Sequence, residues 1–462
     1  MANRKLSRRH FLKAAGLTFW GAALAGCAEK LKLNPPSDRK PFQLRIIASE
    51  EALPDDQLEH FREAFGGSEI NRLAPERVSM MEMVAAGQEV DIFFTRAIKF
   101  PWLARTGLCQ DITEFMTVST NIHLEYLFPV NELCKWNNRW YGLVLDWSPD
   151  FFVWVNKRLW EESETPFPWG KNPHIHLSEW RGLSAKLSRK SSAGDVIGTD
   201  FEIDLLGLFW LASTVDPTIH LFTPDGSQVI LATQPAFIEL VRWIEDWKRE
   251  GGLPVMFTSL KIQNIASCAC VKEIQRDAPT TIRSFISGSS SAQDWLQNQA
   301  VATLQGIGFG SKIINNQVEE EDILVLPAPR YGSKEANPTT KANAMGIPTT
   351  SRHTESAWLF LEWYGNGEPA RERTRQGVGL PINPDYLPLF PQQSSWQKQL
   401  YDTFVHELGQ VQSVIVPLSA YFNPEWLQDL WNQQEEVYLL GHKTLEGFLA
   451  DFDDLVNRSA ET

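Results

Sequence analysis

Side chains that could contact a ligand lie at the end of, or just after, three of the predicted strands. In chain order they are Glu50, Thr95, Arg96, Lys99, Asp146 and Trp147. The hydroxyl and cationic groups can donate hydrogen bonds to ligand oxygens, and a carboxylate accepts two hydrogen bonds from adjacent hydroxyls. An indole adds a flat apolar face. Together these groups could bind a solute through its hydroxyls or through an anionic group.

Each of these residues also has a simpler interpretation. Arg96 and its neighbours could be surface charges on a loop, and Glu50 could be a solvated carboxylate. Asp146 could cap a neighbouring backbone amide. Eighteen tryptophans in 462 residues is a high number. Most should pack in the core, although such an excess also favours a carbohydrate site.

Catalytic and cofactor motifs are absent from the sequence. It contains no GxGxxG after a strand, no HExxH, no CxxC and no GxSxG. His174 and His176 flank an isoleucine next to Pro173, which is typical of a loop rather than of a metal site. We therefore expect no enzyme activity, no metal and no cofactor.

The N-terminus carries an export signal. Ser7–Lys13 contains the paired arginines of a twin-arginine signal, and Leu24–Cys27 resembles a lipobox. The apolar run that follows the arginines, Ala14–Gly26, is too short to span a bilayer, which takes roughly 20 residues. We expect residues 1–26 to be removed.

The same signal predicts where the mature protein works. A lipid on Cys27 would anchor it to the membrane, and the polar residues 27–41 would form a flexible tether. The expected location is therefore periplasmic or at the cell surface, reached by the twin-arginine route.

The net charge limits the classes of molecule that the protein could bind. The formal net charge is −14 at pH 7, and the predicted leader has basic but no acidic residues, so the mature chain is more negative still. Such a chain should repel nucleic acid.

The cysteines could form a disulfide. An oxidising compartment permits disulfides, and Cys109 with Cys134 is the plausible pair. Cys268 and Cys270 are too close for a comfortable bridge.

Strand and helix patterns alternate along the chain. Predicted strands are 44–48, 90–94, 141–146, 151–155 and 323–326, and predicted helices include 55–65, 100–107, 235–250 and one capped by Thr354. The part after Pro381 is mostly helical in pattern. This alternation predicts an α/β protein with parallel sheets, and its length predicts two lobes.

Five blocks, in order, resemble the extracellular solute-binding proteins of ABC importers, in particular the maltose- and trehalose-type carbohydrate binders. The blocks are Glu89–Phe94 with Trp102–Leu108, Trp140–Leu145 with Val155–Leu159, Phe285–Gly288 with Gln305–Gly306, Gly346–Ser351 with Ala357–Leu361, and Leu440–Glu446. No single block is specific to the family. Together, however, the five blocks keep the order of the family and span nearly the whole mature chain.

The resemblance implies a two-lobed periplasmic-binding-protein fold of class II type, with crossover hinge strands and a ligand cleft between the lobes. Lobe one would hold 42–145 and 329–378, and lobe two 149–325 and 379–462. The expected partners are a carbohydrate and the permease subunits of an ABC importer, and the expected state is a monomer.

The resemblance also implies site residues. Asp146 falls where relatives often carry an acidic residue at the first crossover, and Trp147 could stack on a sugar ring. Trp210 lies in a stretch similar to a cleft helix of trehalose-type binders, although core packing is the stronger interpretation. Many relatives have a stacking tryptophan after Gln305–Gly306, where this chain has Phe309 one position later. That departure favours a smaller solute, such as a disaccharide or glycosylated osmolyte.

Two alternatives stay open. The same fold could bind a polyamine, through carboxylates beside aromatic rings, or a phosphorylated solute, through arginine and helix N-termini. More remotely, twin-arginine export often serves redox enzymes that carry cofactors.

Overall fold

The computed structural model describes residues 40–75, 80–148, 152–167, 175–189, 195–216, 218–250, 252–253, 291–333, 341–408 and 419–459. The chain divides into two compact units. Unit 1 comprises Met1–Ser148, Thr340–Pro391 and Gly409–Val414, and unit 2 comprises Pro149–Thr339, Gln392–Leu408 and Ile415–Thr462. Each unit is built on its own sheet.

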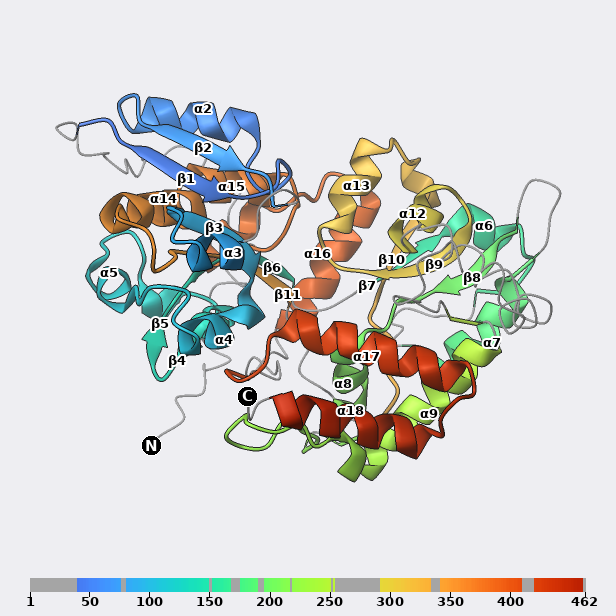
Figure 1. The fold of residues 1–462 in the computed structure, drawn as a ribbon. Coiled ribbons are helices and arrows are strands. Elements are labelled where there is room, and N and C mark those ends of the chain that lie inside the picture. The colour runs from blue at the N-terminus through green and yellow to red at the C-terminus, as the bar shows by residue number, and fades with distance from the viewer. Residues whose placement is uncertain are drawn as a thin grey trace. The chain divides into compact units, whose positions relative to one another are not determined.

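The sheet of unit 1 has five strands in the order β2-β1-β3-β11-β6 (Figure 1). Their bounds are β1 Gln43–Ile47, β2 Glu69–Leu73, β3 Ile92–Arg96, β6 Leu143–Ser148 and β11 Lys341–Gly346. β1 runs parallel to β2 and β3, whereas β11 runs antiparallel to both β3 and β6. The sheet is therefore mixed, and the prediction of parallel sheets was wrong. Apolar runs indicate burial on both faces but do not fix strand direction.

Helices and a two-stranded ribbon complete unit 1. The helices are α2 Asp55–Ala64, α3 Met80–Ala85, α4 Phe100–Arg105, α5 Thr113–Val118, α14 Thr354–Asn366 and α15 Glu368–Arg375. Short 3-10 turns are Ala97–Lys99, Leu124–Tyr126, Pro129–Cys134 and Pro384–Leu389, and the ribbon pairs β4 Lys135–Trp136 with β5 Arg139–Trp140.

Helix boundaries in unit 1 follow the local sequence signals in one case and depart from them in another. α2 has two aspartates in its first turn, and the chain turns at Gly66, whose φ is 62°. In α14, Thr354 is the first helical residue and His353 takes the N-cap position. Thr354 therefore does not cap the helix, because its Oγ1 donates to Oε1 of Gln110 instead, at 2.9 Å.

The sheet of unit 2 has four strands in the order β10-β7-β9-β8. Their bounds are β7 Phe152–Asn156, β8 Ile197–Asp200, β9 Ala300–Gln305 and β10 Ile323–Pro327. β7 is antiparallel to β9 and β10, and β8 is parallel to β9. The second sheet is thus also mixed.

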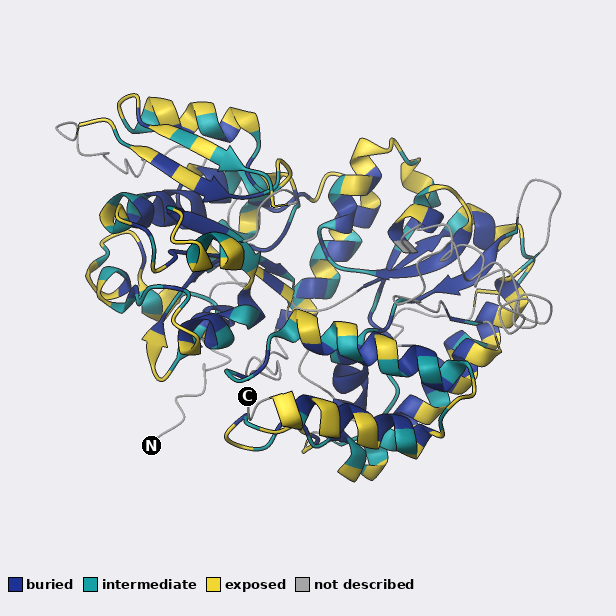
Figure 2. Ribbon diagram, in the orientation of Figure 1, coloured by how far each residue is buried: buried dark blue, intermediate teal, exposed yellow. Residues whose placement is uncertain are grey.

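Helices also accompany the second sheet in unit 2. They are α6 Lys157–Glu161, α7 Leu177–Leu187, α8 Leu205–Ser213, α9 Pro235–Arg249, α12 Ser291–Leu296, α13 Phe309–Asn315, α16 Ser395–Leu408, α17 Pro424–Leu439 and α18 Leu445–Ser459. Two 3-10 turns are Leu231–Thr233 and Glu320–Asp322. Figure 2 shows β7, β9 and β10 buried along most of their length, while α18 exposes one face. Buried residues of β7, β9 and β10 and of α6, α7, α8, α9, α17 and α18 form one large aromatic and aliphatic core.

The third boundary between the units along the chain differs in position from the one expected from sequence. Leu380 belongs to unit 1, where the backbone amides and carbonyls of Trp147 and Leu380 exchange two hydrogen bonds, of 3.1 and 2.8 Å. Unit 1 continues to Pro391 rather than to residue 378. A long-range bridge of this kind leaves no local sequence signal.

Candidate functional site

Three polar side chains share one row across the sheet of unit 1. Asn343 of β11 is the register partner of Arg96 on β3 and of Asp146 on β6. Directly opposed residues on antiparallel strands place their side chains on the same face. Because Arg96 and Asp146 lie near the carboxyl ends of their strands, this row marks the edge of the sheet where ligands of α/β proteins gather.

Asp146 has one carboxylate oxygen engaged and one available. Its Oδ1 accepts a hydrogen bond from Nδ2 of Asn343 at 2.9 Å, and its Oδ2 accepts none from the described residues. The side chain is half-buried. Burial raises the pKa of Asp146 above its ordinary value, and the charge of Arg373 and the Asn343 hydrogen bond lower it in part.

Asn343 and Arg373 were not identified as candidate site residues from the sequence. Asn343 is the exposed polar residue between two buried alanines of β11, which is a weak alternation signal. Arg373 is one of several arginines in α15 and has no distinguishing local pattern. Asn343 reaches Asp146, and Arg373 reaches the carbonyl oxygen of Leu145, only because distant segments pack together.

The remaining polar candidates of unit 1 lie near the same edge. Thr95 and Arg96 are part of β3 itself, whereas we expected them in a loop after the strand. Arg96 is exposed and forms no ion pair within the described residues, and Lys99 ends the following 3-10 turn. Glu50 is exposed in the turn that follows β1.

The three aromatic candidates are buried. Trp147 is 3% exposed, and its Nε1 donates to the carbonyl oxygen of Pro381 at 2.9 Å. Trp210 lies in α8 among buried apolar residues. Phe309, at the start of α13, packs edge-on against Trp154, with ring centroids 5.3 Å apart. All three occupy core positions.

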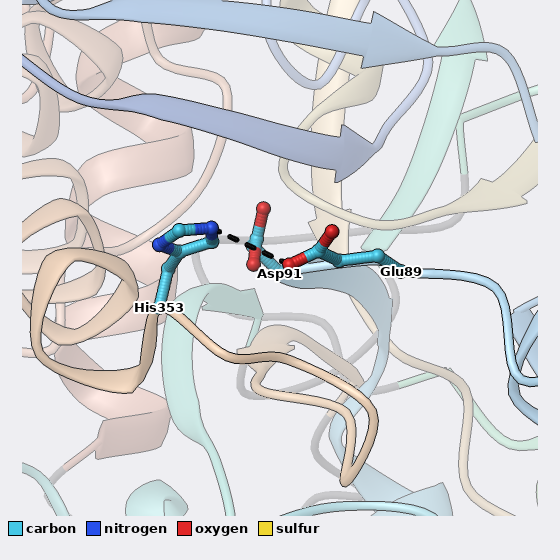
Figure 3. A group of neighbouring side chains, drawn as sticks. All are labelled: Glu89, Asp91 and His353. Carbon is cyan, nitrogen blue, oxygen red and sulfur yellow. Dashed lines mark ion pairs between the residues drawn. The ribbon is translucent and has the colours of Figure 1, made fainter.

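A separate group in unit 1 has metal-ligand chemistry. Glu89, Asp91 and His353 each bring one ligand atom within 4.8 Å of the others (Figure 3). Buried Asp91, however, already accepts from the Arg45 amide at 2.8 Å and from Ser351 Oγ at 2.7 Å. Glu89 and His353 form an ion pair of 3.4 Å between Oε1 and Nε2. The group lies at the N-terminus of α14, where the helix dipole disfavours a cation. We assign Asp91 a structural role, joining β1 to the 351–353 turn.

Cys109 and Cys134 are free, buried thiols, so the disulfide considered for them is not formed in the structure. Burial raises the pKa of both thiols, and the proximity of Cys109 adds to the effect on Cys134.

The predicted leader, tether and lipid anchor lie almost wholly outside the described residues. Cys27, Cys268 and Cys270 are therefore not placed. Within the described ranges, none of the helices has both the length and the apolar character needed to cross a bilayer.

Comparisons with known proteins rest on structure. No family model matches the sequence, and no curated protein matches it. An ABC substrate-binding protein from Listeria monocytogenes in complex with cycloalternan matches with a TM-score of 0.70 at 16% identity, covering 91% of this chain and 100% of that one. A solute-binding protein from Thermotoga lettingae, bound with alpha-D-tagatose, gives 0.69 at 15% identity, with 91% and 100% covered.

A third structure agrees with these two. The maltose-bound MalE3 protein of T. maritima matches with a TM-score of 0.66 at 14% identity, covering 90% of this chain and 99% of its own. These neighbours are solute-binding proteins and not enzymes. The chain therefore has the α/β periplasmic-binding-protein fold of the solute-binding proteins that serve ABC importers.

Proposed function

We propose that this chain is the substrate-binding lipoprotein of an ABC importer, which captures a carbohydrate and delivers it to the membrane permease. The observation that carries the proposal is the row Arg96–Asn343–Asp146 at the carboxyl edge of the first sheet. It combines a cation, an amide and a carboxylate, which are groups that form hydrogen bonds with sugar hydroxyls. The ligands named for the structural neighbours support the same solute class.

Each polar group has a defined part in this proposal. Oδ2 of Asp146 accepts from a ligand hydroxyl, while Arg96 donates to a ring or hydroxyl oxygen. Thr95, Lys99 and Glu50 extend the polar surface. The ligand is a mono-, di- or oligosaccharide or a glycosylated osmolyte. Trp147, Trp210 and Phe309 complete the proposed set, but a stacking role for any of them requires ligand binding to uncover a ring face.

A ligand screen with a matched control tests the proposal. Purified protein is titrated with sugars, osmolytes, polyamines and organophosphates, and the melting temperature and tryptophan fluorescence are recorded. Binding to the native state raises the melting temperature by mass action. We expect a saturable response to a sugar, no turnover of that sugar, and at least about tenfold weaker binding in Asp146→Asn, the range for losing a charged acceptor.

The control variant is Glu63→Gln, which removes an exposed carboxylate of α2 in the same unit. It should bind as the unchanged protein does. A response to polyamines or organophosphates alone would favour the alternative ligand classes, and turnover of a sugar would favour an enzyme. Equal affinity in Asp146→Asn would remove Asp146 from the site.

The lipoprotein part of the proposal is tested in cells. Cys27→Ser should shift the exported protein from the membrane fraction to the soluble fraction, because the acylated sulfur is lost. Replacement of both Arg8 and Arg9 by lysine should retain the precursor in the cytoplasm. Unchanged fractionation of both variants would contradict the predicted anchor and export route.

A further inference from the structure

A second cation lies at the same edge of the first sheet as Arg96. Lys341 is the first residue of β11 and the register partner of Ser148, the last residue of β6. Because β11 runs antiparallel to β3 and β6, its first residues lie where those two strands end. Lys341 lies two positions before Asn343, and the pairing with β6 is regular between them. Side chains alternate along a strand, so Lys341 shares a face with the row described above.

At this edge the two faces of the sheet differ in exposure. Arg96, Asn343 and Lys341 are exposed. Ala342 and its register partner Trp147, whose side chains belong to the opposite face, are only 7% and 3% exposed. The charged groups therefore lie on the side of the sheet that solvent reaches, and the alternation in β11 keeps them there.

The two cations are close enough to contact one small group. Arg96 is directly opposed to Asn343, so it is a diagonal neighbour of Lys341 across the β3–β11 pair. Diagonal neighbours in a sheet lie about 7–8 Å apart, which is within reach of long side chains. Like charges at this separation repel each other, and an anionic group placed between them would replace the repulsion with two attractions.

The nearby carboxylate has another partner. Lys341 is also a diagonal neighbour of Asp146, but Oδ1 of Asp146 accepts from Nδ2 of Asn343 at 2.9 Å, and no ion pair joins it to Lys341 among the described residues. Glu50, the exposed carboxylate after β1, belongs to a strand that β3 separates from β11. The edge therefore offers a carboxylate acceptor on β6 and, beside it, two cations on β3 and β11.

We propose that Arg96 and Lys341 form an anion-binding subsite, and that the carbohydrate bound by this protein carries an acidic group, either a carboxylate or a phosphate. This inference rests on the proposed function and narrows its substrate class. The planar guanidinium of Arg96 donates to two oxygens of the acidic group, in place of a ring or hydroxyl oxygen, and the ammonium of Lys341 adds a further contact. Asp146 accepts from a hydroxyl of the same ligand.

The charges of the subsite separate the ligand classes that the sequence left open. A polyamine would bring ammonium groups against two cations, and a neutral sugar would leave the repulsion between the cations uncompensated. An acidic sugar compensates the cations and still offers hydroxyls to Asp146. The chain as a whole carries a net charge of −14, so an anionic ligand needs a local group of cations such as this one.

Matched neutral and acidic sugars test the inference. Glucose is compared with glucuronate and glucose 6-phosphate, and maltose with maltobionate, by calorimetric titration at pH 7. The unchanged protein should bind an acidic member at least about tenfold more tightly than its neutral counterpart, and added salt should reduce this preference. A preference for glucuronate and maltobionate assigns a carboxylate as the acidic group, and a preference for glucose 6-phosphate assigns a phosphate.

Variants of Lys341 identify the subsite. Lys341→Gln should lose most of the preference and keep its affinity for the neutral sugar, because the ammonium contacts only the acidic group. Lys341→Arg should retain the preference. The matched control is Arg352→Gln, which removes an exposed cation of the 351–353 turn, beyond the opposite end of β11. It should bind both sugars as the unchanged protein does. If Lys341→Gln does not fold, as judged by its melting temperature, Arg96→Gln provides the comparison and should also lose the preference.

The outcomes distinguish this inference from the proposed function. If the unchanged protein binds no carbohydrate, neutral or acidic, the proposed function fails. If it binds neutral sugars at least as tightly as their acidic counterparts, the anion-binding subsite is wrong and the proposed function stands. Equal losses for neutral and acidic sugars in Lys341→Gln would also overturn the subsite. Inorganic phosphate or acetate that binds as tightly as the acidic sugars would show adventitious anion binding only, which contradicts the inferred substrate class.

Discussion

Asn343 donates from Nδ2 to Oδ1 of Asp146 at 2.9 Å, across the antiparallel pair β11–β6. The donor comes from a strand nearly two hundred positions later in the chain, and it leaves Oδ2 of the carboxylate without a partner in the described residues. The amide thereby orients the carboxylate, so that its second oxygen is presented at the edge of the sheet.

The first prediction concerns this amide. Asn343→Ala should weaken sugar binding by about tenfold or more, since a hydrogen bond to a charged group contributes roughly 1.5 kcal/mol or more. Asn343→Asp should weaken it further, because two carboxylates on opposed positions repel each other. Calorimetric titration at pH 7 measures both. Tighter binding in Asn343→Asp than in Asn343→Ala would show that the amide does not orient Asp146.

A pair of glycines in unit 2 gives a prediction on stability. A Cβ added at Gly198 of β8 would lie 2.2 Å from the backbone oxygen of Ser184 in α7. Because backbone atoms must move to accommodate it, Gly198→Ala should cost about 1–3 kcal/mol, as overpacking does. Chemical denaturation measures the free energy of unfolding.

The matched control for this prediction lies in the facing helix. Gly182 is exposed in the interior of α7, and a Cβ there would meet no atom within 4 Å. Gly182→Ala should therefore stabilise by about 0.5–1 kcal/mol, because alanine is the better helix former. Equal effects of the two substitutions would contradict the close approach of α7 and β8.

Local signals predicted much of the fold. The apolar periodicity after Pro235 predicted a helix, and the structure has α9 at Pro235–Arg249. The rule that ligands gather at the carboxyl ends of strands brought Arg96 and Asp146 together as candidates, and the structure places both on one row. The prediction of α9 succeeded because periodicity and helix ends are properties of short segments. The role of Arg96 and Asp146 in ligand binding stays a prediction.

What the sequence did not predict depends on pairing between distant segments. β11 was not among the predicted strands, so the position of Asn343 between Arg96 and Asp146 was missed as well. Arg373 was missed because its contact with Tyr364 depends on how α14 and α15 pack. Apolar runs report burial, whereas register and helix packing are set by tertiary structure.

The buried thiols give a prediction on chemical reactivity. Cys109 and Cys134 are 4% and 0% exposed, and burial raises the pKa of each, so little reactive thiolate is accessible. Both should resist N-ethylmaleimide in the folded protein and react in denaturant, as read by peptide mass mapping. Rapid labelling of either residue in the native state, or a peptide cross-linked through the pair, would contradict the structure.

A buried charge cluster in unit 2 predicts how stability depends on pH. Nζ of Lys248 lies 3.0 Å from Oε1 of Glu245 and 2.6 Å from Oε1 of Glu435, and all three side chains are buried. Burial and the neighbouring charge of Glu435 raise the pKa of Glu245 to about 8, although Lys248 opposes the shift. At neutral pH the folded protein therefore keeps a proton on Glu245 that the unfolded chain has lost.

The sign of the effect follows from this raised pKa. The stabilising contribution of protonated Glu245 is complete below about pH 4.5, the ordinary range of a glutamate, and is lost as the pH rises to about 8. Asp453, whose pKa burial raises to about 6, acts in the same direction over a lower range. Because both groups contribute to the pH dependence of stability, the effect of Glu245 is measured as the difference between a Glu245 variant and the unchanged protein.

Glu245→Gln tests the cluster, since glutamine keeps an acceptor for Lys248 but cannot lose a proton. Its melting temperature relative to the unchanged protein should rise steadily between pH 5 and pH 8.5, as measured by scanning calorimetry. Glu239→Gln, which alters an exposed carboxylate of the same helix, should show a constant difference over this range. A constant difference for Glu245→Gln as well would mean that Glu245 is ionised throughout, with Lys248 neutralising it more completely than burial opposes it.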